Sequence, residues 1–446
     1  PSFMTSRGER GEIEAEGPYT LRFRFDHPNG LFLPKLASFL GLAMTNSPRH
    51  YLETYHPKLG DPDETRRMME LHGLASPEMA YQFVKAKRNP EHPRLWPWVF
   101  RQFSTTSPYL FVRNPYFWAV DQAGNQLPYV DGLMYTVKSA RMIPAAAVSG
   151  EYAFVNVPFT YYTLAARRSA DHPFDLRHWY WGDRSEFVIH PNLNRHVVPE
   201  SEDADRHRET KQKHALLNNR RFRRALSLAI DRERIIEAEY QGTTEPSQAA
   251  PGEGSPFHEP ALNQAFVSHD PEQAAEMLDA IGLTERDWEG YRTFPDGSRM
   301  TFFLNYTHAT MEDAAHFVTD DWAKVGLRVI GRHQGSRLFY ADKATLRHDL
   351  SMWNSNNEYL PLIEARCFVP VRSESNWGLG FARWYQNGGF YGDAAAAVPG
   401  AGEPEPGSAV RRAYELYEQI KATGDLQRQQ ELFKRILRIA AREVWT

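Results

Sequence analysis

The stretch from Met300 to Trp353 decides the fold, and it reads MTFFLNYTHATMEDAAHFVTDDWAKVGLRVIGRHQGSRLFYADKATLRHDLSMW. Its β-branched, aromatic and apolar runs alternate with segments of helical periodicity that end at glycine or a basic residue. We expect strands at 300–306, 327–330 and 348–353, with helices at 310–325 and 336–346 between them. Alternation of this kind predicts an α/β fold in which the strands pair in parallel.

From about residue 189 to the end of the chain, the sequence before and after this stretch is mostly of helical periodicity. Apolar residues at helical spacing predict a helix over 219–240, closed by Gly242. A second helix is expected to start at Asp270-Pro271-Glu272, where an N-cap residue precedes proline. Residues 389–408 are rich in glycine, alanine and proline, which predicts a loop before two terminal helices at 408–422 and 424–442.

Residues 1–188 show a different, mixed character, with many aromatic residues and prolines. Ser76-Pro77-Glu78 predicts a helix start, and this helix should run to about Lys87. The prolines of 89–98 exclude a regular helix, and 121–125 has the glycine and asparagine of a tight turn between strands. Residues 19–25 alternate like a strand that needs neighbours, so we expect the chain to begin inside a longer protein.

Composition excludes several classes of protein. The chain has 446 residues, 52 Lys and Arg against 56 Asp and Glu, and 41% hydrophobic residues. A net charge of −4 without a basic block argues against a nucleic-acid partner. The length predicts about two to four domains, and neither a membrane-spanning run nor a secretory signal is visible. The single cysteine, Cys367, cannot form an intramolecular disulfide.

Known catalytic and metal-binding motifs are not found in the sequence, which lowers the expectation of an enzyme. The pairs His190 with His196 and His207 with His214 lack ligand spacing, and we interpret them as solvated surface histidines. The acidic run 61–64 is interpreted as a helix N-terminus. The arginines of 220–224 predict either an anion site or, as we favour, a helix edge paired with Asp231, Glu233 and Glu237.

Aromatic and amide side chains gather near predicted strand ends and loops. Such groups suit binding, because rings supply contact area at low entropic cost and an amide both donates and accepts hydrogen bonds. Trp353 ends a strand of the α/β region, where ligands dock at carboxyl ends, although these rings can equally be core residues. The candidate ligand contacts are Trp353, Asn354, Asn356, Glu358 and Trp377, with Tyr161 and Trp181 from the first half.

Four segments of the chain resemble one protein family. Residues 218–232, NNRRFRRALSLAIDR, are similar to the helix entry of the extracellular solute-binding proteins of family 5, the peptide and nickel class that serves ABC importers. Residues 113–131, RNPYFWAVDQAGNQLPYVD, resemble the signature of one branch of that family. Residues 322–329 and 348–353 are further matches, so the resemblance covers most of the chain from about residue 17.

The resemblance implies a two-lobed α/β fold of the periplasmic-binding-protein type II. We expect 1–188 to be a first lobe that is incomplete at its N-terminus, 189–443 a second lobe, and 444–446 the start of a return to the first. It implies a monomeric receptor without a cofactor that captures a solute between the lobes and delivers it to an ABC permease. The expected location is periplasmic or extracellular. Relatives begin with a signal sequence and opening strands that are not found here, so we expect a fragment.

One departure from the family concerns the ligand. Peptide-binding members hold the α-ammonium group of the peptide with an aspartate a few residues after the tryptophan, and the matching residue here is Asn356. Glu358 could supply the missing carboxylate, but only if the loop places it differently from the aspartate of the peptide-binding members. Relatives in the matching branch handle oligosaccharides, for which tryptophan stacking and planar amides are suited. Both an oligopeptide and an oligosaccharide therefore stay open as ligands.

Two rival functions belong to other classes. A glycan-active hydrolase would use Glu358 with Asp349 or Glu364 as a carboxylate pair in an aromatic cleft. Such a pair must face each other about 5–9.5 Å apart. A scaffold or chaperone-like protein would bind no small solute and would show no compaction on adding one.

Overall fold

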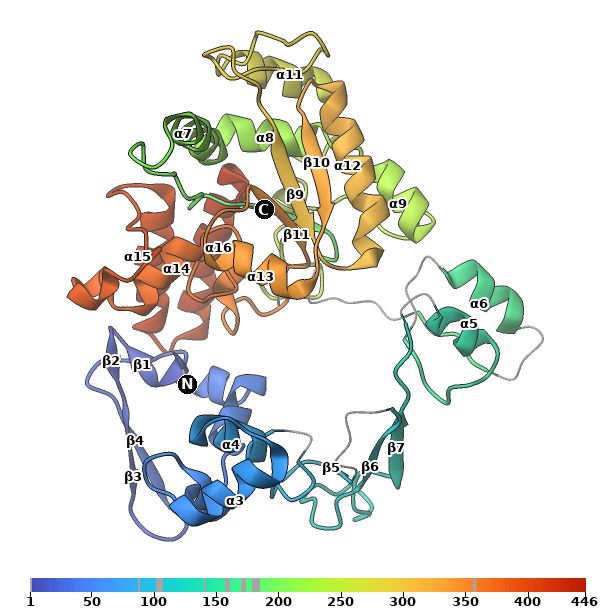
Figure 1. The fold of residues 1–446 in the computed structure, drawn as a ribbon, viewed down its shortest axis with the longest axis vertical. Helices are drawn as coiled ribbons and strands as arrows, with labels where there is room; N and C mark the ends of the chain where they lie inside the picture. Colours follow the sequence, from blue (N-terminus) through green and yellow to red (C-terminus); the bar gives the residue numbers. More distant parts are fainter. Residues whose placement is uncertain are drawn as a thin grey trace. The chain divides into compact units, whose positions relative to one another are not determined.

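The computed structural model describes residues 2–86, 89–101, 107–139, 142–156, 161–169, 174–178, 185–355 and 358–446. The chain forms two compact units, one made of residues 35–157 and the other of 2–34 together with 158–446 (Figure 1). This division differs from the expected boundary at residue 188. It also differs at both ends of the chain, because 2–34 and 444–446 belong to the second unit.

Short helices and a small sheet make up the first unit. The sheet is antiparallel, in the order β5 (Trp98–Phe100), β6 (Tyr109–Arg113) and β7 (Gly132–Tyr135). The helices are η2 (Phe39–Met44), α2 (Arg49–Leu52), η3 (Glu53–Tyr55), α3 (Pro62–His72), α4 (Pro77–Val84) and α5 (Ile143–Val148), while α1 (Phe32–Leu36) spans the boundary between the units.

Three local predictions in the first unit are confirmed. Ser76 caps α4 by accepting a hydrogen bond from the amide of Met79 at 3.2 Å, and the helix ends close to the expected residue. Asp61 caps α3, so the acidic run is a helix N-terminus. In the turn 121–125, the carboxylate of Asp121 accepts hydrogen bonds from the amides of Ala123 and Asn125, while Gly124 takes a φ of 82°.

The N-terminal segment packs on the second unit. It contains η1 (Ser2–Met4), β1 (Thr5–Ser6), β2 (Glu9–Arg10), β3 (Glu12–Ala15) and β4 (Leu21–Arg24), paired as two antiparallel hairpins. The amide of Gly30 donates to the carbonyl of Lys421 at 2.7 Å. A Cβ at Gly30 would lie 1.8 Å from the carbonyl oxygen of Thr423, so only glycine allows this approach. Leu31 is buried in the same core as Phe433.

A four-stranded sheet forms the centre of the second unit, in the order β10-β9-β11-β8. Strands β9 (Phe302–Tyr306), β10 (Val329–His333) and β11 (Leu350–Trp353) pair in parallel, as the sequence predicts. Strand β8 (Val188–Pro191) pairs antiparallel with β11 and was not predicted. The carboxyl ends of the three parallel strands therefore share one edge of the sheet.

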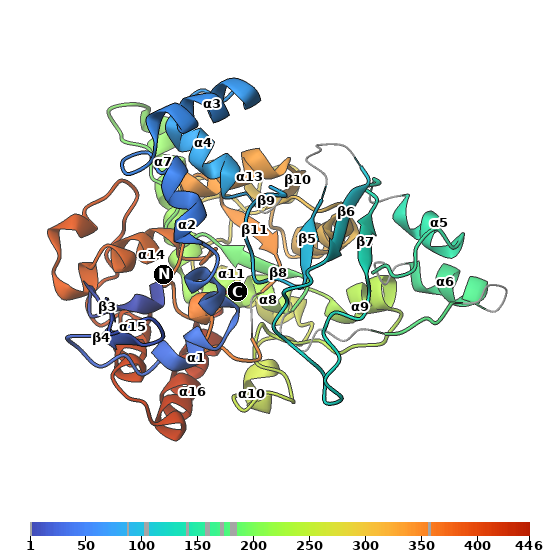
Figure 2. The same cartoon turned by 90° about the horizontal axis from the view of Figure 1, so that it is seen from below.

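Helices account for most of the rest of the second unit. They are α6 (Tyr162–Ser169), α7 (Ala204–Asn218), α8 (Arg220–Leu228), α9 (Arg232–Tyr240), α10 (Pro260–Asn263), α11 (Pro271–Asp279), α12 (Glu312–Lys324), α13 (Ser336–Ala344), α14 (Leu379–Gln386), α15 (Ala409–Lys421) and α16 (Leu426–Glu443), with single 3₁₀ turns η5 (Ala309–Met311), η6 (Ala365–Cys367), η7 (Gly389–Tyr391) and η8 (Ala394–Ala396). The predicted helix 219–240 is two helices, because Asp231 caps α9 by accepting from the amide of Arg234 at 3.0 Å. Helices α15 and α16, red in Figures 1 and 2, pack side by side.

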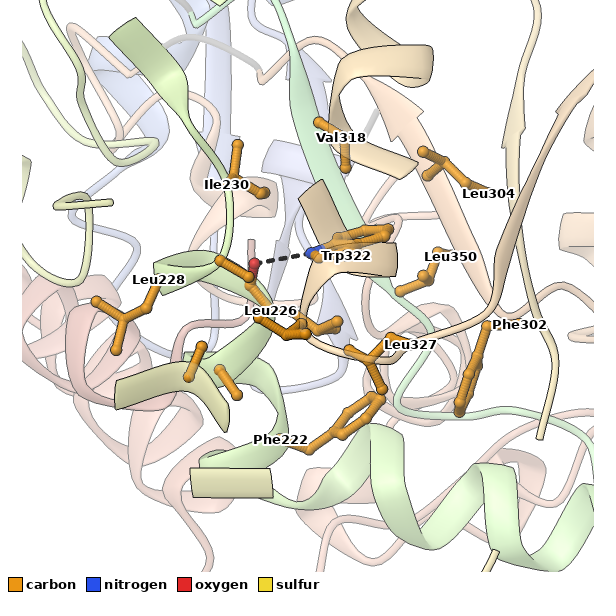
Figure 3. Packing of buried hydrophobic residues seen from close by; sticks show 14 of the residues in the cluster. Phe222, Leu226, Leu228, Ile230, Phe302, Leu304, Val318, Trp322, Leu327 and Leu350 are labelled. Atoms are coloured by element: carbon orange, nitrogen blue, oxygen red, sulfur yellow. Dashed lines mark hydrogen bonds between the residues drawn. The ribbon is translucent and has the colours of Figure 1, made fainter. Parts of the chain in front are cut away.

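Two hydrophobic cores hold the second unit together. The first packs α8, α11 and α12 against the sheet around Trp322, whose indole nitrogen donates to the carbonyl of Leu226 at 2.9 Å (Figure 3). The second joins α14, α15 and α16 to the end of the chain, where Trp445 is buried. Val444 and Trp445 are thus part of the second unit.

The arginines of 220–224 have a structural role, as we favoured, but with different partners. Arg223 is buried and donates to the carbonyls of Glu443, Val444 and Leu217, and to the carboxylate of Glu443 at 3.1 Å. Arg224 donates to the carbonyl of Arg442 at 2.7 Å. These bonds satisfy carbonyl groups at the C-terminal ends of α16 and, through Leu217, of α7, which a helix leaves without internal partners. The predicted pairing with Asp231, Glu233 and Glu237 is not found among them.

Candidate functional site

An aromatic cluster surrounds Trp353 at the carboxyl end of β11. The ring of Phe339 stacks on Trp353 with centroids 5.6 Å apart and an interplanar angle of 25°. Tyr340, also from α13, meets Trp353 at 6.2 Å and 65°. His308, in the segment that follows β9, lies 5.1 Å from the same ring. Two strand ends and one helix of the second unit therefore place four rings together.

Part of this cluster is open to solvent. Phe339 is buried, and Trp353 is half-buried against it. Tyr340 is 51% exposed and His308 is exposed as well. A ring that is fixed on one face and accessible on another can stack on a ligand without first losing conformational freedom. The cluster is thus a preformed contact surface.

The polar segment after Trp353 is fixed by Ser185. The amide of Ser355 donates to the carbonyl of Ser185 at 3.0 Å, and the amide of Ser185 donates to the hydroxyl of Ser355 at 2.7 Å. The hydroxyl of Ser185 donates to the carboxylate of Glu358 at 3.1 Å. Glu358 is buried, while Asn354 is half-buried. These contacts extend the antiparallel pairing beyond the last residue of β11 and ahead of the first residue of β8.

The structure brings only some of the predicted contact residues together. Trp353, Asn354 and Glu358 lie in one region of the second unit. Tyr161 is half-buried just before α6, and no ring contact joins it to Trp353 in the described part of the chain. Asn356 and Trp181 lie outside the described residues.

Trp377 corrects one prediction, because it is a core residue. Its side chain is 0% exposed, it stacks on Trp445 at 4.5 Å and 10°, and its indole nitrogen donates to the carbonyl of Cys367 at 2.7 Å. Both the ring faces and the polar atom are engaged inside the second core. Trp377 therefore has no surface to offer to a ligand in this structure.

Sequence reasoning missed Ser185, His308, Phe339 and Tyr340. Phe339 and Tyr340 lie in the helix predicted at 336–346. The helical spacing of its apolar residues could have shown that both rings lie near the sheet. His308 follows a predicted strand directly, which places it at the sheet edge where ligands dock. Ser185 precedes the unpredicted strand β8, and no local signal marks it.

The carboxylates proposed for a hydrolase are held by structural ion pairs. Asp349 is buried and accepts from the Nε atom of Arg195 at 2.7 Å and from the Nζ atom of Lys213 at 3.2 Å. Glu364 is buried and pairs with Arg372 at 2.8 Å. Carboxylates engaged in this way are part of the scaffold, so the geometry gives the hydrolase alternative no support.

The histidines do not assemble a metal site in the described part of the chain, where no group of three possible ligand side chains was found. His207 and His214 lie 2.8 Å and 3.0 Å from the carbonyl oxygens of Val198 and Arg195. The interpretation of His190 as a solvated surface residue is wrong, because its ring is buried on the sheet. His348 is buried as well.

Acid sensitivity follows from these two buried histidines. Burial, and next the charge of Lys343, lowers the pKa of each of them to about 3. An unfolded histidine titrates near pH 6.5, so between about pH 6.5 and 3 the unfolded state binds more protons than the folded state. The free energy of unfolding therefore falls as the pH falls through this window, by about 1.4 kcal/mol per pH unit for each histidine.

In the variant His190→Gln, the free energy of unfolding should fall less steeply with pH than in the wild type, because only His348 still contributes. Urea unfolding measured from pH 6.5 to 5 gives both slopes. His316 is exposed on α12, and His316→Gln serves as the matched control that keeps the wild-type slope. Equal slopes in the two variants would contradict this account of His190.

Similar solved structures define the class of protein. The oligopeptide-binding protein OppA is 30% identical, with a TM-score of 0.60, and the match covers 98% of this chain and 68% of that one. The periplasmic binding protein MelB of Agrobacterium fabrum C58, solved in complex with stachyose, is 19% identical with a TM-score of 0.71, over 98% of this chain and 60% of that one. The fold is therefore that of the periplasmic solute-binding proteins.

The family follows from the sequence match. The model of the bacterial extracellular solute-binding proteins, family 5, matches residues 3–363, and the chain belongs to this family. The predicted resemblance and fold class are thereby confirmed.

Two curated relatives carry more specific names. The periplasmic alpha-galactoside-binding protein of Rhizobium meliloti (strain 1021) is 26% identical over 294 residues, which are 64% of this chain and 39% of that protein. A probable ABC transporter-binding protein of Deinococcus radiodurans is 23% identical over 226 residues, 49% of this chain and 36% of that protein. The chain thus spans less than two fifths of the length of these relatives. In its described part, no helix is long and apolar enough to cross a membrane.

Proposed function

We propose that the chain acts as the substrate-binding component of an ABC importer, which captures an oligosaccharide and delivers it to a membrane permease. The observation that carries this proposal is the aromatic cluster of His308, Phe339, Tyr340 and Trp353 at the carboxyl ends of the sheet. Aromatic rings fixed in place suit the flat apolar faces of sugar rings, and a neighbouring amide such as Asn354 can donate to and accept from hydroxyl groups.

Names of relatives support the sugar ligand. One relative is described as an alpha-galactoside-binding protein, and the neighbour with the TM-score of 0.71 was solved with stachyose. We propose Trp353 and Asn354 as contacts in the second unit. Tyr161, Trp181, Asn356 and Glu358 are further candidates.

An oligopeptide is the second candidate ligand, favoured by the 30% identity to an oligopeptide-binding protein. The α-ammonium group of a peptide needs a carboxylate partner in a buried site. The position expected to supply it holds an amide, Asn356, and Glu358 is buried and accepts a hydrogen bond from Ser185. These residues favour the oligosaccharide.

The proposed cycle needs no chemical step, so we propose a non-enzymatic, monomeric receptor that works in the periplasm or on the cell surface beside its permease. Ligand binding would favour a closed arrangement only by its differential affinity for the closed and open states. The engagement of Asp349 and Glu364 in ion pairs supports this reading over a hydrolase.

Replacing Trp353 by alanine tests the proposed site. If the ring stacks on the ligand, the affinity should fall by about 1–3 kcal/mol, or roughly 5- to 150-fold, as is usual for an aromatic anchor. Trp288 is 90% exposed on a loop of the second unit, and Trp288→Ala is the matched control that should bind like the wild type. Calorimetric titration with stachyose and with mixed peptides measures both. Unchanged affinity in a folded Trp353→Ala variant would remove this residue from the site.

A further inference from the structure

The ammonium group of Lys343 lies against two rings of the aromatic cluster. Its Nζ atom is 5.1 Å from the ring centroid of Phe339 and 5.5 Å from that of Tyr340, over the ring in both cases. All three residues belong to α13, and residues three or four positions apart share one face of a helix, so one side chain reaches both rings. A cation within about 6 Å of a ring centroid is attracted to the negative face of the ring. Lys343 therefore attracts both of the rings with which α13 contacts Trp353.

A hydrogen bond fixes the position of this ammonium group. It donates to the side-chain oxygen of Asn376, and both residues are 6% exposed. Asn376 directly precedes Trp377, which is enclosed in the second hydrophobic core. A buried cation with a fixed partner cannot follow a ring that moves, so its attraction favours one arrangement of the two rings. Lys343 thus connects the aromatic cluster to the second core.

The rings of Phe339, Tyr340 and Trp353 also contact one another, and Tyr340 is the least enclosed of them. Phe339 meets Tyr340 with centroids 5.6 Å apart and an interplanar angle of 80°. Phe339 is 1% exposed, whereas Tyr340 is 51% exposed. Burial alone fixes a ring like that of Phe339, but a half-exposed ring depends more on its specific contacts. We therefore expect the contact with Lys343 to matter most for Tyr340.

We propose, on the basis of the proposed function of the aromatic cluster, that Lys343 is a positioning residue of the ligand site, which holds the rings of Phe339 and Tyr340 in the arrangement that receives a sugar ring. Lys343 is buried and does not touch the ligand. It acts through the two rings, whose mobility it reduces in the free protein. Rings that are ordered before binding lose less conformational entropy when the ligand arrives, so the affinity is higher.

The positive charge of Lys343 should be lost a little above neutral pH. Burial lowers the pKa of Lys343 to about 8, while the charge of Glu374 opposes this shift and the charge of Arg366 adds to it. Deprotonation removes the attraction to both rings and leaves a neutral amine, which donates a weaker hydrogen bond to Asn376. The positioning of the rings should therefore weaken as the pH rises from 7 to 9.

Other buried ionisable groups lie on β8 and on the segments before and after β11. Burial, and next the charge of Lys343, lowers the pKa of His190 and of His348 to about 3, so both imidazoles stay neutral from pH 7 to 9. The carboxylate of Glu358, after β11, is buried and accepts a hydrogen bond from Ser185. A variant in which residue 343 cannot lose its charge separates the titration of Lys343 from that of every other group.

Calorimetric titration with stachyose at pH 7 and at pH 9 tests the proposal. The affinity of the wild type should fall about 3- to 10-fold between these two values, as the ammonium loses its proton. Lys343→Met keeps the approximate length of the side chain without its charge, and it should bind weakly at both values. Lys343→Arg stays charged and should bind like the wild type at pH 7 and equally well at pH 9. Lys211 is exposed on α7, and Lys211→Met should keep the wild-type dependence.

Two results of this titration would overturn the proposal. One is a wild-type affinity that is the same at pH 7 and pH 9. The other is a folded Lys343→Met variant that binds stachyose as tightly as the wild type at pH 7.

Near-ultraviolet circular dichroism provides a second measurement that needs no ligand, because it reports the fixed packing of aromatic rings. The wild-type spectrum should change between pH 7 and 9, and this change should be absent in Lys343→Arg. An unchanged wild-type spectrum, or the same change in Lys343→Arg, would overturn the role of Lys343. If the predicted change is found but no saccharide binds, the proposed function fails, while the positioning of the rings by Lys343 stands.

Discussion

Replacement of Asp349 by alanine should lower the free energy of unfolding by about 3–5 kcal/mol, the usual cost of removing one partner from a buried ion pair. Asp349 directly precedes β11, and its carboxylate accepts from Arg195 and Lys213 and, at 3.2 Å, from the amide of Phe303. Lys213 is buried as deeply as Asp349 itself. In the variant, two cations and one strand amide lose their common acceptor inside the protein.

Urea unfolding at pH 7 measures this effect against Asp320→Ala, which removes an exposed carboxylate on α12 and should change stability by no more than about 0.5 kcal/mol. Asp349→Asn should fall between the two, because the amide oxygen still accepts hydrogen bonds but carries no charge. A loss below about 1 kcal/mol in Asp349→Ala would mean that Arg195 and Lys213 find other partners at little cost.

Replacement of Trp322 by alanine should cost about 3–5 kcal/mol, because it opens a large cavity at the centre of the first core. The ring is 0% exposed and lies among residues of α8, α12 and the sheet (Figure 3). Alanine also removes the donor to the carbonyl of Leu226. The same urea experiment measures the loss.

Two variants separate the causes. Trp322→Phe keeps most of the volume and should recover much of the stability, while the carbonyl of Leu226 still lacks its donor. Trp288→Ala removes an exposed tryptophan and should have almost no effect. Equal stability of Trp322→Ala and Trp288→Ala would contradict the assignment of Trp322 to the core.

The architecture of the second unit was largely predictable because its signals are local. Strand and helix periodicities between Met300 and Trp353 gave the parallel β/α order, and capping residues such as Asp270 marked helix starts. The break at Asp231 within a continuous amphipathic pattern was missed, because the same aspartate can be a helical surface residue or a cap. The antiparallel strand β8 is four residues long and separated from its partner by over 150 residues, so no local pattern identifies the pairing.

The site was predicted only in part, because burial depends on contacts that sequence spacing does not show. Trp353 was proposed as a ligand contact from its place at a strand end, and the structure surrounds it with rings. Trp377 has the same local composition, but it is buried by Trp445, 68 residues further along the chain. His190 was misjudged for the same reason, because only its register with Ser351 places it inside the protein. The packing of residue 30 and its neighbours against residues near 421–433 joins segments far apart in the chain, and no local pattern in the sequence shows it.

Direct titration of the wild-type chain with stachyose and with peptides, followed by thermal unfolding and by chromatography of the recovered ligand, tests the central claim most directly. The account predicts that an oligosaccharide raises the unfolding midpoint in a concentration-dependent way. At 100 times its dissociation constant, the ligand should add about 2.7 kcal/mol to the free energy of unfolding. It also predicts that the oligosaccharide is recovered intact. Cleavage of the ligand, or the absence of stabilisation by any saccharide or peptide, would contradict the account.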